Sequence, residues 1–115
     1  QAARLYRNEI AIAAVDHTVP RTIAAQAADE LLEVSGVKAS FVIFDSGNDS
    51  ISISARSYGD MNVQIIMEYL GGGGRRTMAA AQLGGVNMQE AKSKLCEAID
   101  AKYPRADGEE QDSIS

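Results

Sequence analysis

Four consecutive glycines, residues 71–74, stand directly before Arg75, Arg76 and Thr77. Glycine loses more backbone entropy on folding than any other residue, so such a run needs a reason. Closely spaced glycines let backbone N–H groups approach an anion, and a helix starting after them would add partial positive charge. Arg75 and Thr77 would add a charged and a hydroxyl donor. We therefore predict a phosphate-binding loop, with a plain turn or linker as the alternative; its residues are Gly72, Gly73, Gly74, Arg75 and Thr77.

The stretch "SISISARS", residues 50–57, alternates in polarity, which is typical of a strand with one buried face. Its isoleucines would point one way, and Ser54 and Arg56 would lie side by side on the other face. Taken alone, an arginine beside serines is usually a solvated strand position. Because this strand leads directly into the helix that the glycines end, we predict that Ser54 and Arg56 share a cleft with the glycine loop.

The named phosphate and catalytic motifs do not fit the sequence. A P-loop needs a lysine after the glycines, and a Rossmann fingerprint follows a strand rather than a helix. Metal-dependent hydrolysis needs clustered carboxylates and histidines, but the chain has one histidine, His17, beside Asp16. Cys96 lies near the apolar stripe of a predicted helix, which favours a packed thiol over a nucleophile. We predict that the chain by itself holds no metal or cofactor and is not a catalyst.

The composition is that of one soluble globular domain. The 115 residues are 45% hydrophobic and 23% charged, with no apolar run near the ~20 residues of a membrane span. A single cysteine excludes an internal disulfide and fits a reducing, cytoplasmic setting. The net charge of −5 disfavours a general nucleic-acid binder, whereas Arg56, Arg75 and Arg76 form a local cationic group suited to a small phosphate ligand. The absence of an initiator Met and of a leader predicts a fragment of a longer protein.

These residues require a small α/β framework. Strands are expected at 9–16, 40–44 and 50–57, with a weaker candidate at 79–83, and helices at 20–36, 62–70 and 87–103. The predicted fold is a single domain with a mixed β-sheet and packed helices, in the order β-α-β-β-α-(β)-α; a ferredoxin-like arrangement is the alternative. Residues 1–8 are expected to be a linker, 9–104 the domain, and 105–115 a flexible acidic tail.

Helix ends and buried faces follow from spacing. Pro20 suits a first helical position and Gly36 a stop; Asp60 or Asn62 would cap the second helix; Asn87 with Glu90 resembles a capping box. Gly71 would end the second helix with a positive φ. The expected buried faces are Ile23, Ala27 and Leu31 in the first helix, Val63, Ile66, Met67 and Leu70 in the second, and Met88, Ala91, Leu95 and Ala98 in the third.

Three segments together resemble a known family. "AADELLEVSGVKASFVIF", "ISARSYGDMNVQIIMEYLGGGG" and "TMAAAQL" are similar to the C-terminal DHHA1 domain of the DHH/DHHA1 phosphoesterases. The branch most resembled is that of the membrane-anchored bacterial cyclic-di-AMP phosphodiesterases. The resemblance runs from about residue 10 to 103 and rests on a serine–arginine strand end, an NVQ helix start and a glycine run before a short helix.

The resemblance implies a division of labour. An upstream DHH domain would hold two divalent metals, with manganese the expected ion, and the DHHA1 domain would hold the nucleotide across a cleft. Arg56 and Ser57 would contact phosphate or sugar, and residues 72–74 would bring backbone donors close to a phosphate. The family pattern GGGH reads GGGR here, so Arg75 replaces a histidine. Because arginine is charged at all working pH values, it stabilises charge but cannot transfer a proton. We therefore expect altered rate or substrate preference.

The leading function is the substrate-binding half of a metal-dependent phosphodiesterase that hydrolyses cyclic dinucleotides such as cyclic-di-AMP. An alternative keeps the family but binds short single-stranded oligonucleotides; another is a ligand-sensing or dimerising regulatory domain. The partners implied are the nucleotide and the upstream DHH domain, and a homodimer stays open. The longer protein would be anchored in the cell membrane with this domain on the cytoplasmic side, and the chain itself would make no membrane contact.

Overall fold

The computed structural model describes residues 2–105, which form six strands and three helices. In chain order these are β1 (Ala2–Tyr6), β2 (Ile10–Thr18), α1 (Arg21–Leu32), β3 (Ala39–Gly47), β4 (Ser50–Ser57), α2 (Val63–Tyr69), β5 (Gly73–Arg75), β6 (Met78–Gly84) and α3 (Met88–Lys102).

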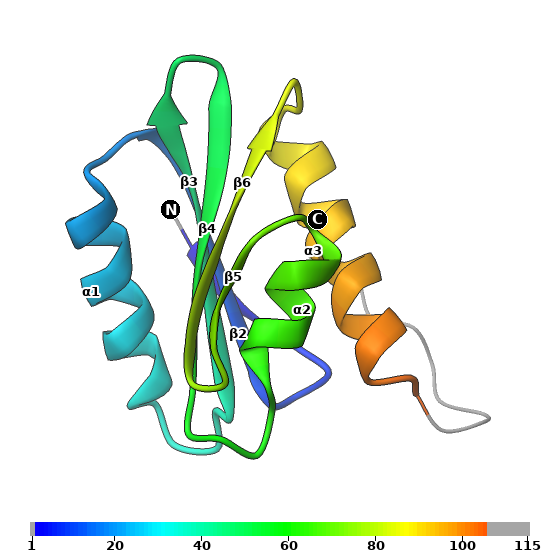
Figure 1. The fold of residues 1–115 in the computed structure, drawn as a ribbon. Helices are drawn as coiled ribbons and strands as arrows, with labels where there is room; N and C mark the ends of the chain where they lie inside the picture. Colours follow the sequence, from blue (N-terminus) through cyan, green and yellow to red (C-terminus); the bar gives the residue numbers. More distant parts are fainter. Residues whose placement is uncertain (1, 106–115) are drawn as a thin grey trace.

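One mixed sheet carries all six strands, in the order β1-β2-β3-β4-β6-β5. Strands β2 and β3 run parallel and are joined through α1, and the other neighbouring pairs are antiparallel. Helix α1 covers one face of the sheet, and α2 and α3 cover the other (Figure 1). The prediction of a mixed sheet with packed helices is confirmed, but β1 and β5 are strands that it lacked.

The stretch expected to be a linker, residues 1–8, contains an edge strand instead. Tyr6 pairs with Ile10, and of the three residues between them Arg7 and Asn8 have φ angles of 59° and 67°. Positive φ at both positions is the geometry of a tight hairpin turn, in which asparagine is well tolerated. Because the turn between β1 and β2 is polar, the sequence pattern did not indicate this strand. Of the expected acidic tail, residues 106–115 lie outside the described part of the chain.

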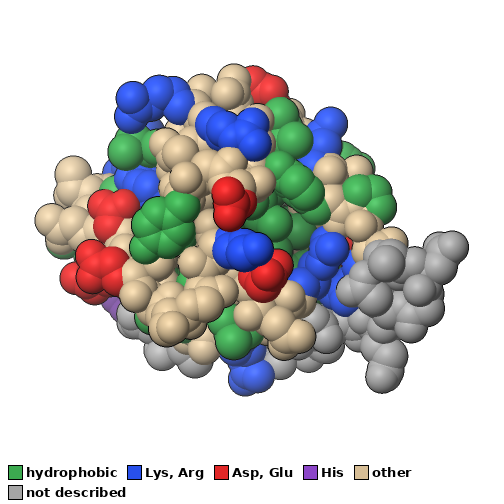
Figure 2. All heavy atoms as spheres, turned by 90° about the horizontal axis from the view of Figure 1, so that it is seen from below, with side chains coloured by type: hydrophobic (Ala, Val, Ile, Leu, Met, Phe, Trp, Pro, Cys, Tyr) green, Lys and Arg blue, Asp and Glu red, His purple; other side chains and the backbone are tan. Residues whose placement is uncertain are grey.

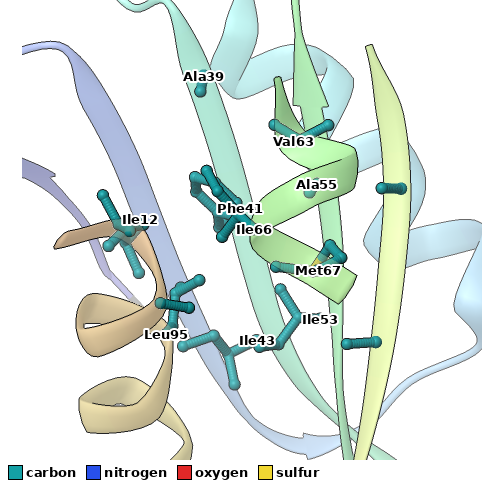
Figure 3. Packing of buried hydrophobic residues seen from close by; sticks show 14 of the residues in the cluster. Ile12, Ala39, Phe41, Ile43, Ile53, Ala55, Val63, Ile66, Met67 and Leu95 are labelled. Atoms are coloured by element: carbon teal, nitrogen blue, oxygen red, sulfur yellow. The ribbon is translucent and has the colours of Figure 1, made fainter. Parts of the chain in front are cut away.

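The larger core lies between the sheet and helices α2 and α3. Phe41 and Ile43 of β3, Ile53 of β4, Ile66 of α2 and Leu95 of α3 are fully buried there. Figure 3 shows the side chains from the sheet and those from the two helices pointing toward one another. The expected inward direction of the odd-numbered β4 residues is confirmed, because Ile53 and Ala55 belong to this core and Ile51 packs against it.

Helix α1 turns a different face to the sheet from the one predicted. Ala24, Ala28 and Leu32 are buried, whereas Ile23 is 50% exposed. Small side chains let the helix approach the sheet closely, as shown by the Ser40 hydroxyl, which donates to the carbonyl of Ala28 at 2.6 Å. The buried stripe is therefore set by the close fit to β3 rather than by the largest residues. Pro20 is the N-cap, one position before the helix starts.

Helices α2 and α3 follow the prediction more closely. The Asn62 carboxamide accepts from the backbone N–H of Gln64 at 2.9 Å, and the Asn87–Glu90 capping box is present. Of the expected buried faces, Leu70 and Met88 are only partly buried, and Ile99 joins the α3 face. The described residues include no helix with both the length and the hydropathy needed to cross a bilayer.

Candidate functional site

Strands β4, β6 and β5 present small and polar side chains on the side of the sheet where α1 lies. Directly paired residues of antiparallel strands point to the same face, so the register defines the rows of this surface. Arg56 pairs with Met78, which pairs with Arg75; Ser54 pairs with Ala80, which pairs with Gly73; Ser52 pairs with Gln82. We call this surface the open face; its residues are Ser52, Ser54, Arg56, Gly73, Arg75, Met78, Ala80 and Gln82.

The open face is left uncovered because α1 does not extend across the whole sheet. The helix packs on β3 and β4, and β6 and β5 lie beyond it (Figure 1). Met78 is accordingly 42% exposed, and Ala80 and Gln82 are exposed, whereas Ser54 beside α1 is 4% exposed. The alternation of exposed and buried residues along β6 therefore separates a core face from a surface that can receive a ligand.

Arg56 is held in a fixed direction at the edge of α1. Its Nε donates to the Asp29 carboxylate at 2.9 Å, and its Nη1 donates to the carbonyl of Ala55 at 2.9 Å. The side chain is only 12% exposed, and Asp29 is 59% exposed. A guanidinium has five N–H donors, so these two bonds orient the group and leave it further donor capacity toward an anion.

Arg75 lies in the same row of the open face as Arg56, with Met78 between them. Its Nη2 is 3.6 Å from the Met78 sulfur, and the residue is exposed. Two strand spacings of about 4.8 Å separate the Cα atoms of Arg56 and Arg75 by roughly 10 Å. The register thus places the strand-end arginine and the arginine after the glycines in one row of one sheet face.

The glycine run is not followed by a helix, which corrects the expected source of partial positive charge. It ends α2, forms β5 and enters a hairpin to β6. Gly71 has φ +87° and donates to the Glu68 carbonyl at 3.0 Å, as a helix-ending glycine does. The weak strand candidate at 79–83 is confirmed, and the observed strand β6 extends it by one residue at each end.

Two further glycines are explained by close approach of the backbone. A Cβ on Gly72 would lie 2.1 Å from the Ala80 carbonyl oxygen, and a Cβ on Gly74 would lie 2.5 Å from the Cα of Ala79. Gly73 alone in the run has an ordinary φ and open space where its Cβ would be. The packing of β5 on β6 therefore accounts for Gly72 and Gly74, and Gly73 is the glycine that leaves room above the open face.

Ser57 and Thr77 lie away from the two arginines. Ser57 is 5% exposed and one position from Arg56, so it points to the opposite face of β4. Its hydroxyl donates to the Arg76 carbonyl at 3.1 Å and accepts from the backbone N–H of Gly59 at 3.3 Å. Thr77 is exposed in the turn of the hairpin. These contacts, with Arg76 Nε donating to the Gly59 carbonyl at 2.6 Å, fasten the hairpin to the loop after β4.

A hollow of about 380 Å³ adjoins the open face near the start of α1. Its three polar side chains, those of Arg21, Ser52 and Gln82, were not among the predicted site residues. The alternation of residues 50–57 could have indicated Ser52, because it precedes Ser54 on the same face of β4. The pairing of Ser52 with Gln82 could not be predicted, because it depends on the register between β4 and β6. The hollow is completed by Gly71, Gly72, Ala80 and Ala81.

The titratable groups with shifted pKa values, Tyr6 and Cys96, lie in the packed interior away from the open face. Burial, with a hydrogen bond from its hydroxyl to Asp100 at 2.7 Å, raises the pKa of Tyr6 to about 12. Burial followed by the nearby Asp100 charge raises the pKa of Cys96 to about 11, so its thiol is a poor nucleophile. His17 and Asp16 are 3.6 Å apart at an exposed strand end. Within residues 2–105 no three His, Cys, Asp or Glu side chains group as metal ligands.

At the end of the molecule shown in Figure 2, basic side chains do not merge into one large patch. Figure 2, seen from the end at which the β5–β6 hairpin turns, shows Lys and Arg side chains interspersed with acidic ones. A long polyanion needs a continuous basic stripe, whereas a small phosphate ligand needs only a few converging donors. The charge distribution therefore suits a small ligand.

Comparisons with known proteins identify relatives of this chain. A family model described as "DHHA1 domain" matches residues 7–103. The chain is 52% identical over 101 residues to the cyclic-di-AMP phosphodiesterase GdpP of Geobacillus thermodenitrificans, which covers 86% of this chain and 15% of that protein. It is 48% identical over 105 residues to the cyclic-di-AMP phosphodiesterase PdeA of Listeria monocytogenes, covering 90% and 16%. The chain thus spans about a sixth of the length of these relatives.

Solved structures share the fold at lower identity. An exopolyphosphatase-related protein from Bacteroides fragilis superposes with a TM-score of 0.74 at 20% identity, over 89% of this chain and 32% of that one. The C-Ala domain of alanyl-tRNA synthetase from Aquifex aeolicus does so with a TM-score of 0.65 at 17% identity, over 86% and 98%. Because the family match takes in nearly every described residue, and relatives about half identical span most of the chain, the chain belongs to the DHHA1 domain family.

Proposed function

We propose that the open face binds the phosphate-bearing part of a cyclic dinucleotide, and that the domain is the substrate-binding half of a phosphodiesterase acting on cyclic-di-AMP. The observation that carries this proposal is the shared row of Arg56 and Arg75 on one sheet face. Two guanidinium groups converging on one phosphodiester give charge-assisted hydrogen bonds, roughly twice as strong as neutral ones. The relatives named as cyclic-di-AMP phosphodiesterases support the choice of ligand.

Each residue of the face has a distinct role in this binding. Asp29 orients the Arg56 guanidinium, so less side-chain freedom is lost when phosphate arrives. Arg75 approaches from the far side of Met78, and the absent side chain at Gly73 lets the ligand reach the sheet. Ser54 lies two positions before Arg56 on the same face of β4, in the row of Ala80 and Gly73. We assign Gly72, Gly74, Ser57 and Thr77 to supporting the hairpin rather than to ligand contact.

The chemical step belongs to another part of a longer protein. An upstream DHH domain would supply two divalent metals, with manganese the expected ion, and a water that attacks the phosphodiester. The described residues themselves offer no metal-ligand cluster. In this proposal the longer protein is anchored in the cell membrane with the domain on its cytoplasmic side, and the cleft closes between the two domains.

Arg56 provides the direct test. Arg56→Ala in the 115-residue chain should weaken cyclic-di-AMP binding at least tenfold by calorimetry, because a charge-assisted contact is removed. Arg4→Ala, at an exposed position on β1, is the matched control and should leave binding unchanged. Equal affinity for Arg56→Ala and the unchanged chain would overturn the proposal. A short oligoadenylate that binds more tightly than cyclic-di-AMP would favour the oligonucleotide alternative.

Arg75 tests the departure from the family pattern. Arg75→His in a longer protein carrying the DHH domain should change turnover or substrate preference, because only histidine can transfer a proton near pH 7. Turnover of cyclic-di-AMP and its linear product should be compared before and after the substitution. An unchanged profile across both substrates would remove the special role of Arg75.

A further inference from the structure

The hollow beside Ser52 lies at the opposite end of the open face from Arg56. Both residues are on β4 and four positions apart, so about 14 Å of extended strand separates them. Between them the floor is made of Ser54, Ala80 and Gly73, whose side chains are small or absent. A ligand that fills both ends must be longer than a phosphate and must be thin enough to lie on this floor.

The edge of β6 beside the hollow carries an open backbone donor and acceptor. The carbonyl of Thr77 accepts from Ser57 in β4, so odd-numbered β6 residues direct their backbone groups to β4. Even-numbered residues therefore face β5, and the last of these that has a β5 partner is Ala80, opposite Gly73. The backbone N–H and C=O of Gln82 consequently point past the end of β5, beside Gly71 and Gly72, which line the same hollow.

The polar groups at the hollow include acceptors as well as donors. The Gln82 side chain offers an amide N–H₂ and an amide oxygen, and its backbone offers one N–H and one C=O. The Ser52 hydroxyl donates to the Ser46 oxygen at 2.8 Å, so its own lone pairs are left as acceptors. With the Arg21 guanidinium, these groups make the hollow mixed in donors and acceptors rather than purely cationic. A nucleobase edge, which combines donors and acceptors, is complementary to them.

We infer that this hollow, lined by Arg21, Ser52 and Gln82, binds a nucleobase, and that Gln82 selects adenine. A glutamine amide can pair with adenine N6 and N7 through two hydrogen bonds, which guanine cannot mirror because it presents two acceptors there. The inference rests on the proposed function for its phosphate end, where Arg56 lies. The adenine of a nucleotide would thus occupy the hollow while its phosphate reaches the arginine row.

A titration of the 115-residue chain followed by NMR tests this placement. AMP should shift the backbone amide resonances of Ser52 and Gln82 as well as that of Arg56, whereas ribose 5-phosphate should shift Arg56 only. GMP should bind about tenfold more weakly than AMP. Identical shift patterns for AMP and ribose 5-phosphate, or equal affinity for AMP and GMP, would overturn the inference.

Substitution of Gln82 gives an independent readout. Gln82→Ala should weaken AMP binding about tenfold and reduce the preference over GMP, while ribose 5-phosphate binding stays within twofold. Because Gln82 is exposed, the variant should fold; Gln89→Ala, exposed in the first turn of α3, is the matched control and should leave both ligands unaffected. A Gln82→Ala chain with the original AMP-to-GMP ratio would contradict the inference.

Adenosine separates a failure of this inference from a failure of the proposed function. Adenosine that shifts Ser52 and Gln82, while neither ribose 5-phosphate nor AMP shifts Arg56, would support the base site and overturn the phosphate site. Ribose 5-phosphate that shifts Arg56, while adenosine and AMP leave Gln82 unmoved, would do the reverse. The absence of shifts with all of these ligands would overturn both.

Discussion

The two faces of strands β4 and β6 differ sharply although they use alternate residues of the same segments. On one face Ile53, Ala55 and Ala81 are buried beneath α2 and α3. On the other, Ser54, Gln82 and their neighbours form the open face, which α1 covers only in part. Because a strand sends successive side chains to opposite faces, one pattern of period two can specify both a core and a ligand surface.

The comparison predicts unequal costs for neighbouring substitutions in β4. Ile53→Ala should lower the free energy of unfolding by about 4 kcal/mol, because it leaves a cavity in the larger core. Ser54→Ala, on the open face, should change it by no more than about 1 kcal/mol. Urea denaturation of both variants measures the difference. Equal losses would show that the open face is also part of the core.

The glycine run offers a second pair with opposite expectations. Gly72→Ala should lower the free energy of unfolding by about 3 kcal/mol, because the new Cβ would meet the Ala80 carbonyl at 2.1 Å. Gly73→Ala should be tolerated within about 1 kcal/mol, because its φ is ordinary and the space is open. Thermal and urea unfolding of the two chains would contradict this if Gly73→Ala were the more damaging change.

High pH should weaken the core side of the molecule. The pKa of Tyr6 is raised from 10.0 to about 12, so the folded chain keeps a proton that the unfolded chain releases. The contribution of Tyr6 to stability is therefore complete below pH 10 and falls as the pH rises toward 12. The pKa of Cys96 is raised from 9.0 to about 11, so its contribution to the loss of stability begins one pH unit earlier.

Unfolding free energies measured from pH 8 to 12 test this slope. Tyr6→Phe loses the hydrogen bond to Asp100 but should also lose the part of the decline that begins near pH 10. A decline of the same steepness in Tyr6→Phe and the unchanged chain would place its origin elsewhere. The slope should not depend on the open face, so Arg56→Ala should retain it.

The smallest stability effect is expected for the ion pair at the edge of the open face. Asp29→Asn should lower the free energy of unfolding by at most about 1 kcal/mol, because Asp29 is 59% exposed. The same substitution should weaken phosphate binding severalfold, because Arg56 loses the partner that orients it. Calorimetry with cyclic-di-AMP beside urea denaturation separates the two effects; Glu30→Gln, the exposed neighbour, is the control.

Much of the framework could be predicted because local rules decided it. The helix caps at Asn62 and Asn87, the turn glycine Gly71 and the alternation of β4 all depend on residues close in sequence. The buried face of α1 and the strand β1 could not be predicted, because Ala24, Ala28 and Tyr6 gain their burial from distant partners. Within the candidate site, Arg56 and Arg75 were predictable as types, but their common row was not.

The sequence alone determined the family, the mixed α/β framework and the residues able to bind an anion, since these follow from motifs, periodicity and side-chain chemistry. The pairing of β5 outside β6, which places Arg75 in the row of Arg56, and the β4–β6 register, which places Gln82 at the hollow, came from the tertiary structure. The physical reason is that strand order and register arise from contacts between segments far apart in the chain. A shift of one residue in register would send these side chains to the other face.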